Sequence, residues 1–218
     1  MFIDDRISGI RANSTVVAVK RFSQEVQTEF VRKSIHMLIA MVPTIASISR
    51  ELALCLLGSG ILFYTYAEFS RLSGRNLPII SRITVAASRE RDSYGFVLGP
   101  VTLAIGAMIA LMLYPAIIAQ IAIYSLAFGD SLSSIVGKMF GRVAIPGSGG
   151  KTFAGSTACF FAVFFTTWQV THNTQVSFIT ACTGTLLEAL PLRDFDNIIL
   201  PVGTGFMASL LITQFPLS

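Results

Sequence analysis

One polar stretch of the chain, GDSLSSIVGKMFGRVAIPGSGGKTFAGS at residues 129–156, combines side chains that suit phosphate chemistry. Asp130 is flanked by serine hydroxyls, and Lys138 and Lys151 follow it. A carboxylate with hydroxyls and lysines nearby suits a Mg²⁺ ion that keeps several waters and bridges phosphate oxygens. The alternative is a structural ion pair between Asp130 and Lys138 or Arg142. The residue types favour a phosphate and metal site with Asp130 as its central acid.

The Gly-Gly-Lys-Thr segment of this stretch has the composition of a P-loop but not its spacing. A P-loop needs glycine six positions before the lysine, and that position here is Ile145. What remains is a turn whose backbone N–H groups can converge on an anion, a lysine, and a helix start that favours phosphate. The residues that carry this expectation are Gly149, Gly150, Lys151, Thr152 and Ser156. The alternative is an ordinary flexible loop that happens to contain lysine.

Further ionisable and amide side chains lie near the ends of apolar segments. They are Arg32, Lys33, His36, Glu68, Glu188, Asp196 and Asn197. Taken singly, each residue also has a purely structural interpretation. For example, Asp196 could be a helix cap, Glu68 could form a local pair with Arg71, and His36 could be a buried histidine with its hydrogen bonds satisfied. Together they predict that carboxylates, cations and an amide gather at one end of a set of helices, as a site for a metal ion and a di-anion.

The elements that must position these residues are apolar runs without charge. Residues 93–129, 152–187 and 197–218 contain no Asp, Glu, Lys or Arg, and the chain as a whole is 53% hydrophobic and 13% charged. One membrane-spanning helix needs about 20 apolar residues, so the first two runs each fit a helical hairpin. The sequence therefore predicts an all-α polytopic membrane protein. Its seven expected helices lie within 34–49, 52–67, 93–113, 116–129, 152–170, 176–187 and 197–218.

The positive charges predict the orientation of this bundle. Of the 16 Lys and Arg residues, all but Arg50 fall before the first expected helix or in the loops on that same side. Short loops rich in cations stay in the cytoplasm, so we expect the N-terminus inside and the C-terminus outside, in the plasma membrane. Residues 1–33 are expected to form a cytosolic lead-in that ends in an amphipathic helix at 23–33, without a cleavable signal peptide. Residues 34–218 are expected to form a single transmembrane domain.

Two further classes of interaction are not expected. The net charge of +4 reflects topology, because no soluble basic face remains to bind nucleic acid. Cys55, Cys159 and Cys182 lie inside apolar runs without paired spacing. Neither a disulfide nor a zinc site is therefore expected.

Several segments together resemble one enzyme family. In order along the chain, they are EFVRKSIHMLIAMVP, YAEFSR, RERDSYGFVLGP, LAFGDSLSSIVGKMFGR, GGKTFAGS and LLEALPLRDFDN. This order resembles the polyprenol kinase family, which comprises dolichol kinase, phytol kinase and CTP-dependent diacylglycerol kinase and is related to phosphatidate cytidylyltransferase. The resemblance implies a multi-pass membrane enzyme that transfers a phosphoryl group from CTP, with Mg²⁺, to a lipid alcohol.

The resemblance also implies roles for individual residues. Asp130, Lys151, Glu188 and Asp196 would be catalytic, with Asp130 and Asp196 holding the metal. The nucleotide site would be lined and closed by Lys138, Gly149, Gly150, Lys151, Thr152, Ser156, Asn197, Arg32, Lys33, His36 and Glu68. The sequence departs from the family at Ala154, where the family usually has Glu.

Two alternatives to the kinase remain open at this stage. The related cytidylyltransferases would use the same nucleotide but attack its α-phosphorus. Their sequences typically carry a Lys-Arg and then a Lys-Asp pair after the Gly-Asp, whereas Gly137-Lys138 and Gly141-Arg142 follow the kinase pattern. A small transporter is the other alternative, but its acids are expected near the middle of the bilayer. The lipid acceptor stays open among polyprenol, phytol-like alcohols and diacylglycerol, as does CTP over ATP.

Overall fold

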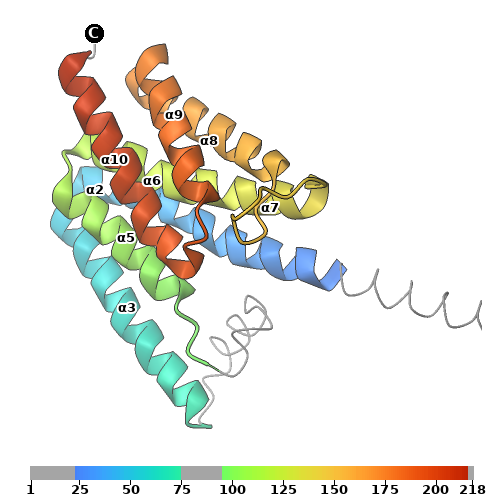
Figure 1. The fold of residues 1–218 in the computed structure, drawn as a ribbon. Coiled ribbons are helices and arrows are strands. Elements are labelled where there is room, and N and C mark those ends of the chain that lie inside the picture. The colour runs from blue at the N-terminus through green and yellow to red at the C-terminus, as the bar shows by residue number, and fades with distance from the viewer. Residues whose placement is uncertain (1–22, 75–94, 216–218) are drawn as a thin grey trace, which may run out of the picture.

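The computed structural model describes residues 23–74 and 95–215, and this part of the chain is almost entirely helical (Figure 1). Its only pairing of extended backbone is an isolated antiparallel bridge between Ala144 and Thr152. The all-α prediction is therefore confirmed for these residues. Most of the expected lead-in and part of one cation-rich loop, with Arg75, Arg82, Arg89 and Arg91, lie outside the described residues, as do residues 216–218.

The helices follow the apolar runs of the sequence. The first extends over Ser23–Ile48 and ends in η1 (Leu38–Met41) and α2 (Val42–Ile48). The others are α3 (Arg50–Leu72), α5 (Gly99–Leu113), α6 (Ala116–Tyr124), η3 (Ser125–Asp130), α7 (Ser131–Phe140), α8 (Phe153–Thr171), α9 (Thr174–Ala189), η4 (Arg193–Phe195) and α10 (Asp196–Gln214). The elements α6, η3 and α7 form one continuous helix, Ala116–Phe140, which is called the central helix below.

Three tight connections join consecutive helices and make them antiparallel. The Ser49 side chain caps the N-terminus of α3 by accepting a hydrogen bond from the Leu52 N–H at 3.1 Å. Asn173 caps α9 in the same manner, and Pro115 stands at the start of α6. Each cap satisfies N–H groups that the helix itself leaves without a partner. The chain therefore turns back sharply at three places on the side of the bundle opposite the long loops.

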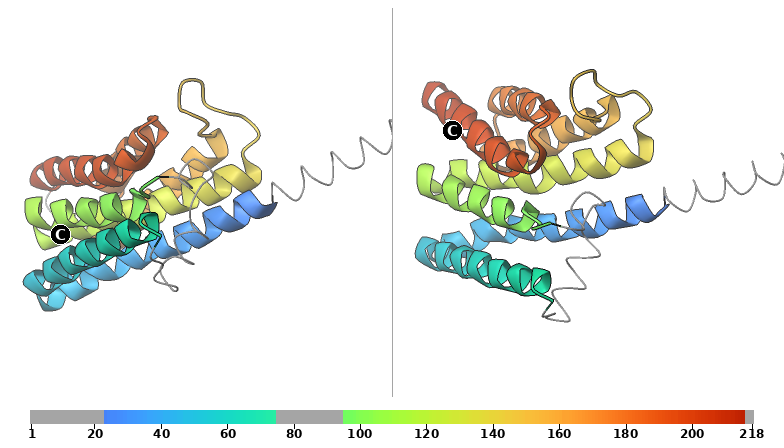
Figure 2. Two further views of the ribbon diagram at one scale, coloured as in Figure 1. Left: turned by 90° about the horizontal axis from the view of Figure 1, so that it is seen from below. Right: turned by 60° about the horizontal axis from the view of Figure 1, so that its bottom comes forward.

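The helices stack in three layers (Figure 2). The first helix and α3 form one outer layer, α5 and the central helix form the middle, and α8, α9 and α10 form the other outer layer. In the most apolar 18-residue stretch of the central helix, 67% is buried inside the protein. The corresponding share in the other candidate membrane spans is 39% or less. The central helix therefore contacts both outer layers and can bring residues from both to one site.

Five helices are long and apolar enough to cross a membrane: Ser23–Ile48, Arg50–Leu72, Ala116–Phe140, Phe153–Thr171 and Arg193–Gln214. Large apolar side chains such as Leu62 and Phe63 are exposed on their outer faces. The chain is thus a multi-pass membrane protein. The helix Gly99–Leu113 is apolar but shorter, and α9 has 16 residues. Seven spans, and the orientation of the bundle, stay predictions.

The structure corrects two expected helix boundaries. The sequence predicts that the fourth helix ends at Asp130 and that Lys138 lies in a loop, but the helix continues to Phe140 through the π-helical segment η3. It continues because residues 131–140 keep a polar face toward the protein and an apolar face outward. The expected boundary between residues 33 and 34 falls inside the continuous first helix.

Candidate functional site

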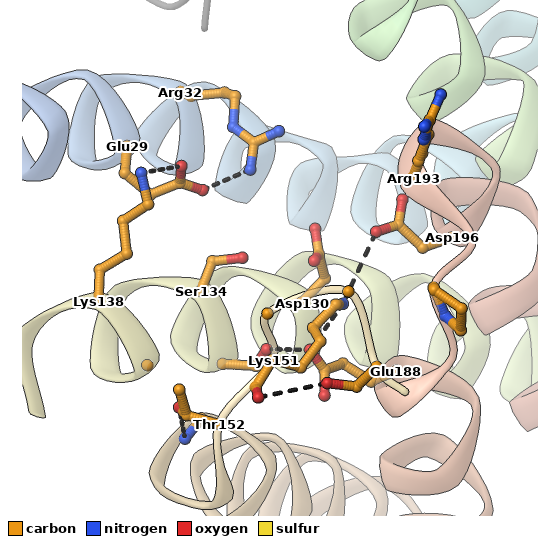
Figure 3. Close-up of a pocket in the computed structure, with 17 residues that line it drawn as sticks. Glu29, Arg32, Asp130, Ser134, Lys138, Lys151, Thr152, Glu188, Arg193 and Asp196 are labelled. Carbon is orange, nitrogen blue, oxygen red and sulfur yellow. Dashed lines mark hydrogen bonds and ion pairs between the residues drawn. The ribbon is translucent and has the colours of Figure 1, made fainter. Parts of the chain in front are cut away.

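A cleft of about 630 Å³ opens at the end of the bundle that holds the long loops (Figure 3). Its walls come from the first helix, the central helix, the 141–152 loop, the start of α8 and the segment from α9 to α10. The lining residues include four cations and four carboxylates, which are Arg32, Lys138, Lys151, Arg193, Glu29, Asp130, Glu188 and Asp196. Elements that are distant in the sequence therefore present opposite charges around one space.

Asp130 is held at the base of the cleft by residues of the first helix. Lys33 donates a hydrogen bond to Asp130 Oδ2, and His36 Nδ1 lies 3.1 Å from the same oxygen. All three side chains are buried. A buried charge is stable only when it is paired, and Lys33 supplies the pairing here. Both contacts fall on Oδ2, so within the described part of the chain Oδ1 keeps its lone pairs for a further ligand.

The π-helical segment explains why Asp130 lies within a helix and still lines a cleft. A π turn adds one residue to a helical turn and shifts the following side chains around the helix axis, and such turns are frequent at functional sites. The segment Ser125–Asp130 is almost entirely buried. Asp130 therefore faces the other elements of the site from the most enclosed helix of the bundle.

The 141–152 loop is a compact hairpin and not an unordered linker. Ile145 N–H donates to the Lys151 carbonyl at 2.8 Å, and Phe153 N–H donates to the Val143 carbonyl at 3.1 Å. Gly150 has φ +100°, a conformation that a side chain would strain. These bonds fix the backbone of Lys151, so the segment is an ordered turn and not the flexible loop of the alternative; its binding of an anion stays a prediction.

The start of α8 packs unusually close to the central helix. A Cβ atom on Gly155 would lie 2.7 Å from the Ser133 carbonyl oxygen, so only glycine fits there. The Thr152 hydroxyl caps this helix by accepting from the Gly155 N–H at 3.2 Å. The N-terminus of α8, which is the positive end of the helix dipole, therefore borders the cleft.

Glu188 accepts hydrogen bonds from three elements of the cleft. It accepts hydrogen bonds from Ser133 at 2.6 Å, from Lys151 at 2.8 Å and from Ser156 at 3.3 Å. The side chain is 2% exposed. Its two oxygens are thus occupied by partners from α7, α8 and the hairpin. Glu188 therefore ties three elements together and positions the ammonium group of Lys151.

Lys151 remains positively charged in this environment. Burial alone would lower the pKa of Lys151, but the charge of Glu188 and its hydrogen bond, with the more distant charges of Asp130 and Asp196, raise the pKa above its usual value. Lys151 Nζ lies 3.9 Å from Asp196 Oδ2. The ammonium group thus lies between the carboxylates of Glu188 and Asp196.

A second group of charges forms the rim toward the first helix. Glu29 pairs with Arg32 one helical turn away and with Lys138 of α7 at 3.1 Å. Sequence reasoning missed Glu29 as a site residue. Its spacing of three from Arg32 was a detectable signal, but a pair of this kind also occurs on any solvated helix. Only the packing of the first helix against α7 brings it to the cleft.

The predicted site residues divide into three groups. Nine line the cleft: Arg32, Asp130, Lys138, Gly149, Gly150, Lys151, Thr152, Glu188 and Asp196. Lys33, His36 and Ser156 lie behind the lining, where they contact Asp130 or Glu188.

Glu68 and Asn197 are not part of the lining. Glu68 pairs with Arg71 at 2.7 Å and accepts from the Val97 N–H at 3.0 Å, which holds the end of α3 to the chain that leads into α5. The Asn197 amide donates to the Thr102 hydroxyl at 2.8 Å and to the Gly99 carbonyl at 3.3 Å, which joins α10 to α5.

The carboxylates do not form a complete metal cage. Within residues 23–74 and 95–215, no group of three or more His, Cys, Asp and Glu side chains is arranged to hold a metal ion. A Mg²⁺ ion bound with a nucleotide does not require one, because phosphate and water oxygens supply most of its ligands and the protein adds one or two carboxylates. The free Oδ1 of Asp130 and the lightly bonded Asp196 fit that smaller role.

Comparison with known proteins finds no relative of this chain. No model of a protein family matches it, and neither does a curated protein or a solved structure. Its function must therefore be argued from the cleft itself.

Proposed function

We propose that this protein is an integral membrane lipid kinase that transfers the terminal phosphoryl group of a nucleoside triphosphate, CTP by resemblance, to the hydroxyl of a lipid alcohol. The observation that carries the proposal is the cleft at one end of a membrane-spanning bundle. It combines four cations, four carboxylates, a glycine hairpin and a helix N-terminus. A volume of about 630 Å³ is in the range of pockets that hold a small ligand.

The position of the cleft suits two different substrates, a water-soluble nucleotide and a lipid alcohol. Every described Lys and Arg except Arg50 lies in the half of the bundle that holds the cleft, so by the positive-inside rule the cleft faces the cytoplasm. A water-soluble nucleotide reaches the cleft from that side. A lipid alcohol keeps its chain in the hydrocarbon and presents only its hydroxyl group at the interface. An all-helical protein suits this task because its backbone polar groups are satisfied within the bilayer.

Each part of the cleft has a role in phosphoryl transfer. The hairpin N–H groups and Lys151 bind phosphate oxygens, as backbone nests and lysines do in other nucleotide sites. Glu188 positions Lys151 and takes no direct part. Asp130 would hold Mg²⁺ through its free Oδ1, and the ion would neutralise charge on the phosphate oxygens; Asp196 is left for the acceptor step.

The acceptor step needs one proton to be removed. The lipid oxygen forms a bond to the terminal phosphorus, the bond from that phosphorus to the bridging oxygen breaks, and the nucleoside diphosphate leaves. The hydroxyl proton passes to a carboxylate. Asp196 is the best candidate, because its one described partner is 3.9 Å away whereas Glu188 already accepts three hydrogen bonds. Transfer then rests mainly on positioning and electrostatic stabilisation.

Two competing functions fit the structure less well. A cytidylyltransferase must bind an acceptor that is already phosphorylated, yet Arg71 is engaged by Glu68 outside the cleft and Arg32 is held by Glu29, which leaves Arg193 as the one unengaged arginine of the described lining for both the nucleotide and the acceptor. A transporter is expected to place its acids near the middle of the bilayer. Of the buried acids of the described spans, Glu29 and Glu68 lie near the helix ends on the side of the long loops, and Asp130 lies two residues beyond the middle of the central helix on that side.

One experiment separates these functions. The purified protein in nanodiscs is incubated with CTP or ATP labelled at the α or γ position and with polyprenol, phytol, diacylglycerol or phosphatidate, and the lipids are separated by chromatography. We expect γ label in a lipid alcohol. Label from the α position in the phosphatidate product would establish nucleotidyl transfer instead. Absence of label from every lipid would refute both.

A matched pair of variants tests the acceptor step. Asp196→Asn should reduce the rate of transfer by at least about 100-fold, as is usual when a general base is removed. Asp194→Asn, two positions away and outside the cleft lining, should leave the rate within about twofold. Equal rates for the two variants would show that Asp196 is not the base.

A further inference from the structure

Arg193 lies at the rim of the cleft in an unusual backbone conformation. It begins the short element η4, between α9 and α10, and it lines the cleft. Its φ is +55°, in the left-handed region that residues with a side chain rarely adopt. Such conformations persist only where the surrounding structure imposes them, and they concentrate at functional sites. A glycine at this position would remove the strain, so the presence of an arginine points to a use for its side chain.

Arg193 is also the one cation of the described cleft lining that lacks an acidic partner. Arg32 and Lys138 share Glu29, and Lys151 pairs with Glu188. The Arg193 guanidinium makes no hydrogen bond or ion pair within the described residues, and no dashed line reaches it in Figure 3. Its five N–H donors therefore remain available to a ligand.

The surroundings of Arg193 place it opposite the anion-binding hairpin. The segment that carries Arg193 touches the hairpin, because a Cβ atom on Gly149 would lie 3.3 Å from Pro191 Cβ. Gly149 and Gly150 have φ values of +70° and +100°, so the hairpin turns sharply where it meets this segment. A group bound between them would contact backbone N–H groups on one side and the guanidinium on the other.

We propose that Arg193 binds the terminal phosphoryl group of the nucleotide in this cleft. This inference rests on the proposed function, since it assumes a nucleoside triphosphate as the donor. The planar guanidinium can donate two parallel hydrogen bonds to phosphate oxygens, which a lysine cannot do. Arg193 lines the same cleft as Gly149, Gly150 and Lys151, so its fork can contact a group bound there. A phosphorylated lipid headgroup offers the same oxygens, so the test includes it as a second source.

The left-handed backbone conformation of Arg193 makes glycine a substitution that removes the side chain without straining the backbone. Arg193→Gly removes the guanidinium and permits the left-handed conformation, so it should fold at least as well as the wild type. Arg193→Lys keeps the charge and the strain but loses the fork. Arg142→Gly is the matched control, because Arg142 is an exposed arginine of the neighbouring loop that does not line the cleft.

Binding is measured by isothermal titration on protein in nanodiscs of neutral lipid, with CTP, CDP and CMP as separate ligands and Mg²⁺ present. We expect Arg193→Gly to weaken CTP binding by roughly 10- to 100-fold and CMP binding by less than about twofold. Arg193→Lys should be intermediate. A second arm adds phosphatidate to the nanodiscs and asks whether it competes with CTP in the wild type but not in Arg193→Gly.

The outcomes separate this inference from the proposed function. Loss of CTP affinity in Arg193→Gly but not in Arg142→Gly supports the assignment, even if no lipid is ever phosphorylated. Equal CTP affinity in the two variants, or equal losses for CTP and CMP, overturns it while leaving the kinase proposal intact. If Arg193→Gly loses only the competition by phosphatidate, the nucleotide assignment is wrong and Arg193 binds the lipid phosphate instead.

Discussion

The buried pair of Lys33 and Asp130 offers the sharpest test of how the site is held together. Both side chains are almost fully buried, and they join the first helix to the central helix. Lys33→Met leaves the Asp130 carboxylate without its charged partner in a dry environment, and Asp130→Asn leaves the Lys33 ammonium group in the same state. The double variant Lys33→Met with Asp130→Asn removes both charges and leaves no buried ion unpaired.

The expected magnitudes follow from the burial of the pair. Breaking a buried ion pair on one side costs about 3–5 kcal/mol in the free energy of unfolding, because the remaining charge is unpaired. For a chain of this size, 1 kcal/mol corresponds to about 2–4 °C in the melting temperature. Each single variant should therefore melt roughly 6–20 °C below the wild type. The double variant should regain most of this loss, since replacing both partners of a buried pair is often nearly neutral.

The assay combines thermal unfolding in nanodiscs with lipid phosphorylation by the same samples. We expect the double variant to be stable but inactive, because Asp130 has lost the charge that we assign to the metal. A double variant that melts no higher than the less stable single variant would show that the two residues are not coupled. A double variant with near-normal transfer would show that Asp130 has only a structural role.

Further predictions concern Lys151, Asn197 and the topology of the bundle. Lys151→Gln should weaken triphosphate binding at least about tenfold, whereas Arg142→Gln should not. Because the pKa of Lys151 is raised, its charge and its stabilising pair should persist above the usual value near 10.4. The stability difference between Lys151→Gln and the wild type should thus stay constant from pH 6 to 9 and shrink only at higher pH, and a decline below pH 9 would contradict the assigned pairing. Asn197→Ala should lower the free energy of unfolding by about 1–3 kcal/mol and leave CTP affinity unchanged, and a loss of affinity without a loss of stability would place Asn197 in the nucleotide site. Finally, a cysteine at Asn173 should react with an impermeant thiol reagent in intact cells and one at Gly149 should not, and the reverse pattern would invert the topology.

Much of the architecture could be predicted from the sequence, because lipid imposes a simple rule. A chain that crosses hydrocarbon must satisfy its backbone polar groups internally, and charge-free runs of sufficient length therefore predict helices. Tyr114-Pro115 and Asn173 are local turn and cap signals, and the structure places helix ends at both. The hairpin glycines predicted a turn near Lys151 for the same local reason. The length of the central helix could not be predicted, because the π-helical segment has no recognisable signature in composition.

The partners of the charged residues that pair across the bundle were decided by tertiary structure alone. The sequence offered Lys138 or Arg142 as the counter-ion of Asp130, but the partner is Lys33, 97 positions away. Ser133 and Glu188 are separated by 55 positions and Lys151 and Glu188 by 37. Side-chain type shows that a buried charge needs a partner, because an unpaired ion in a medium of low dielectric is costly. Which partner it finds depends on how three layers of helices pack, since apolar faces of similar composition fit together in many ways and only their shapes select one.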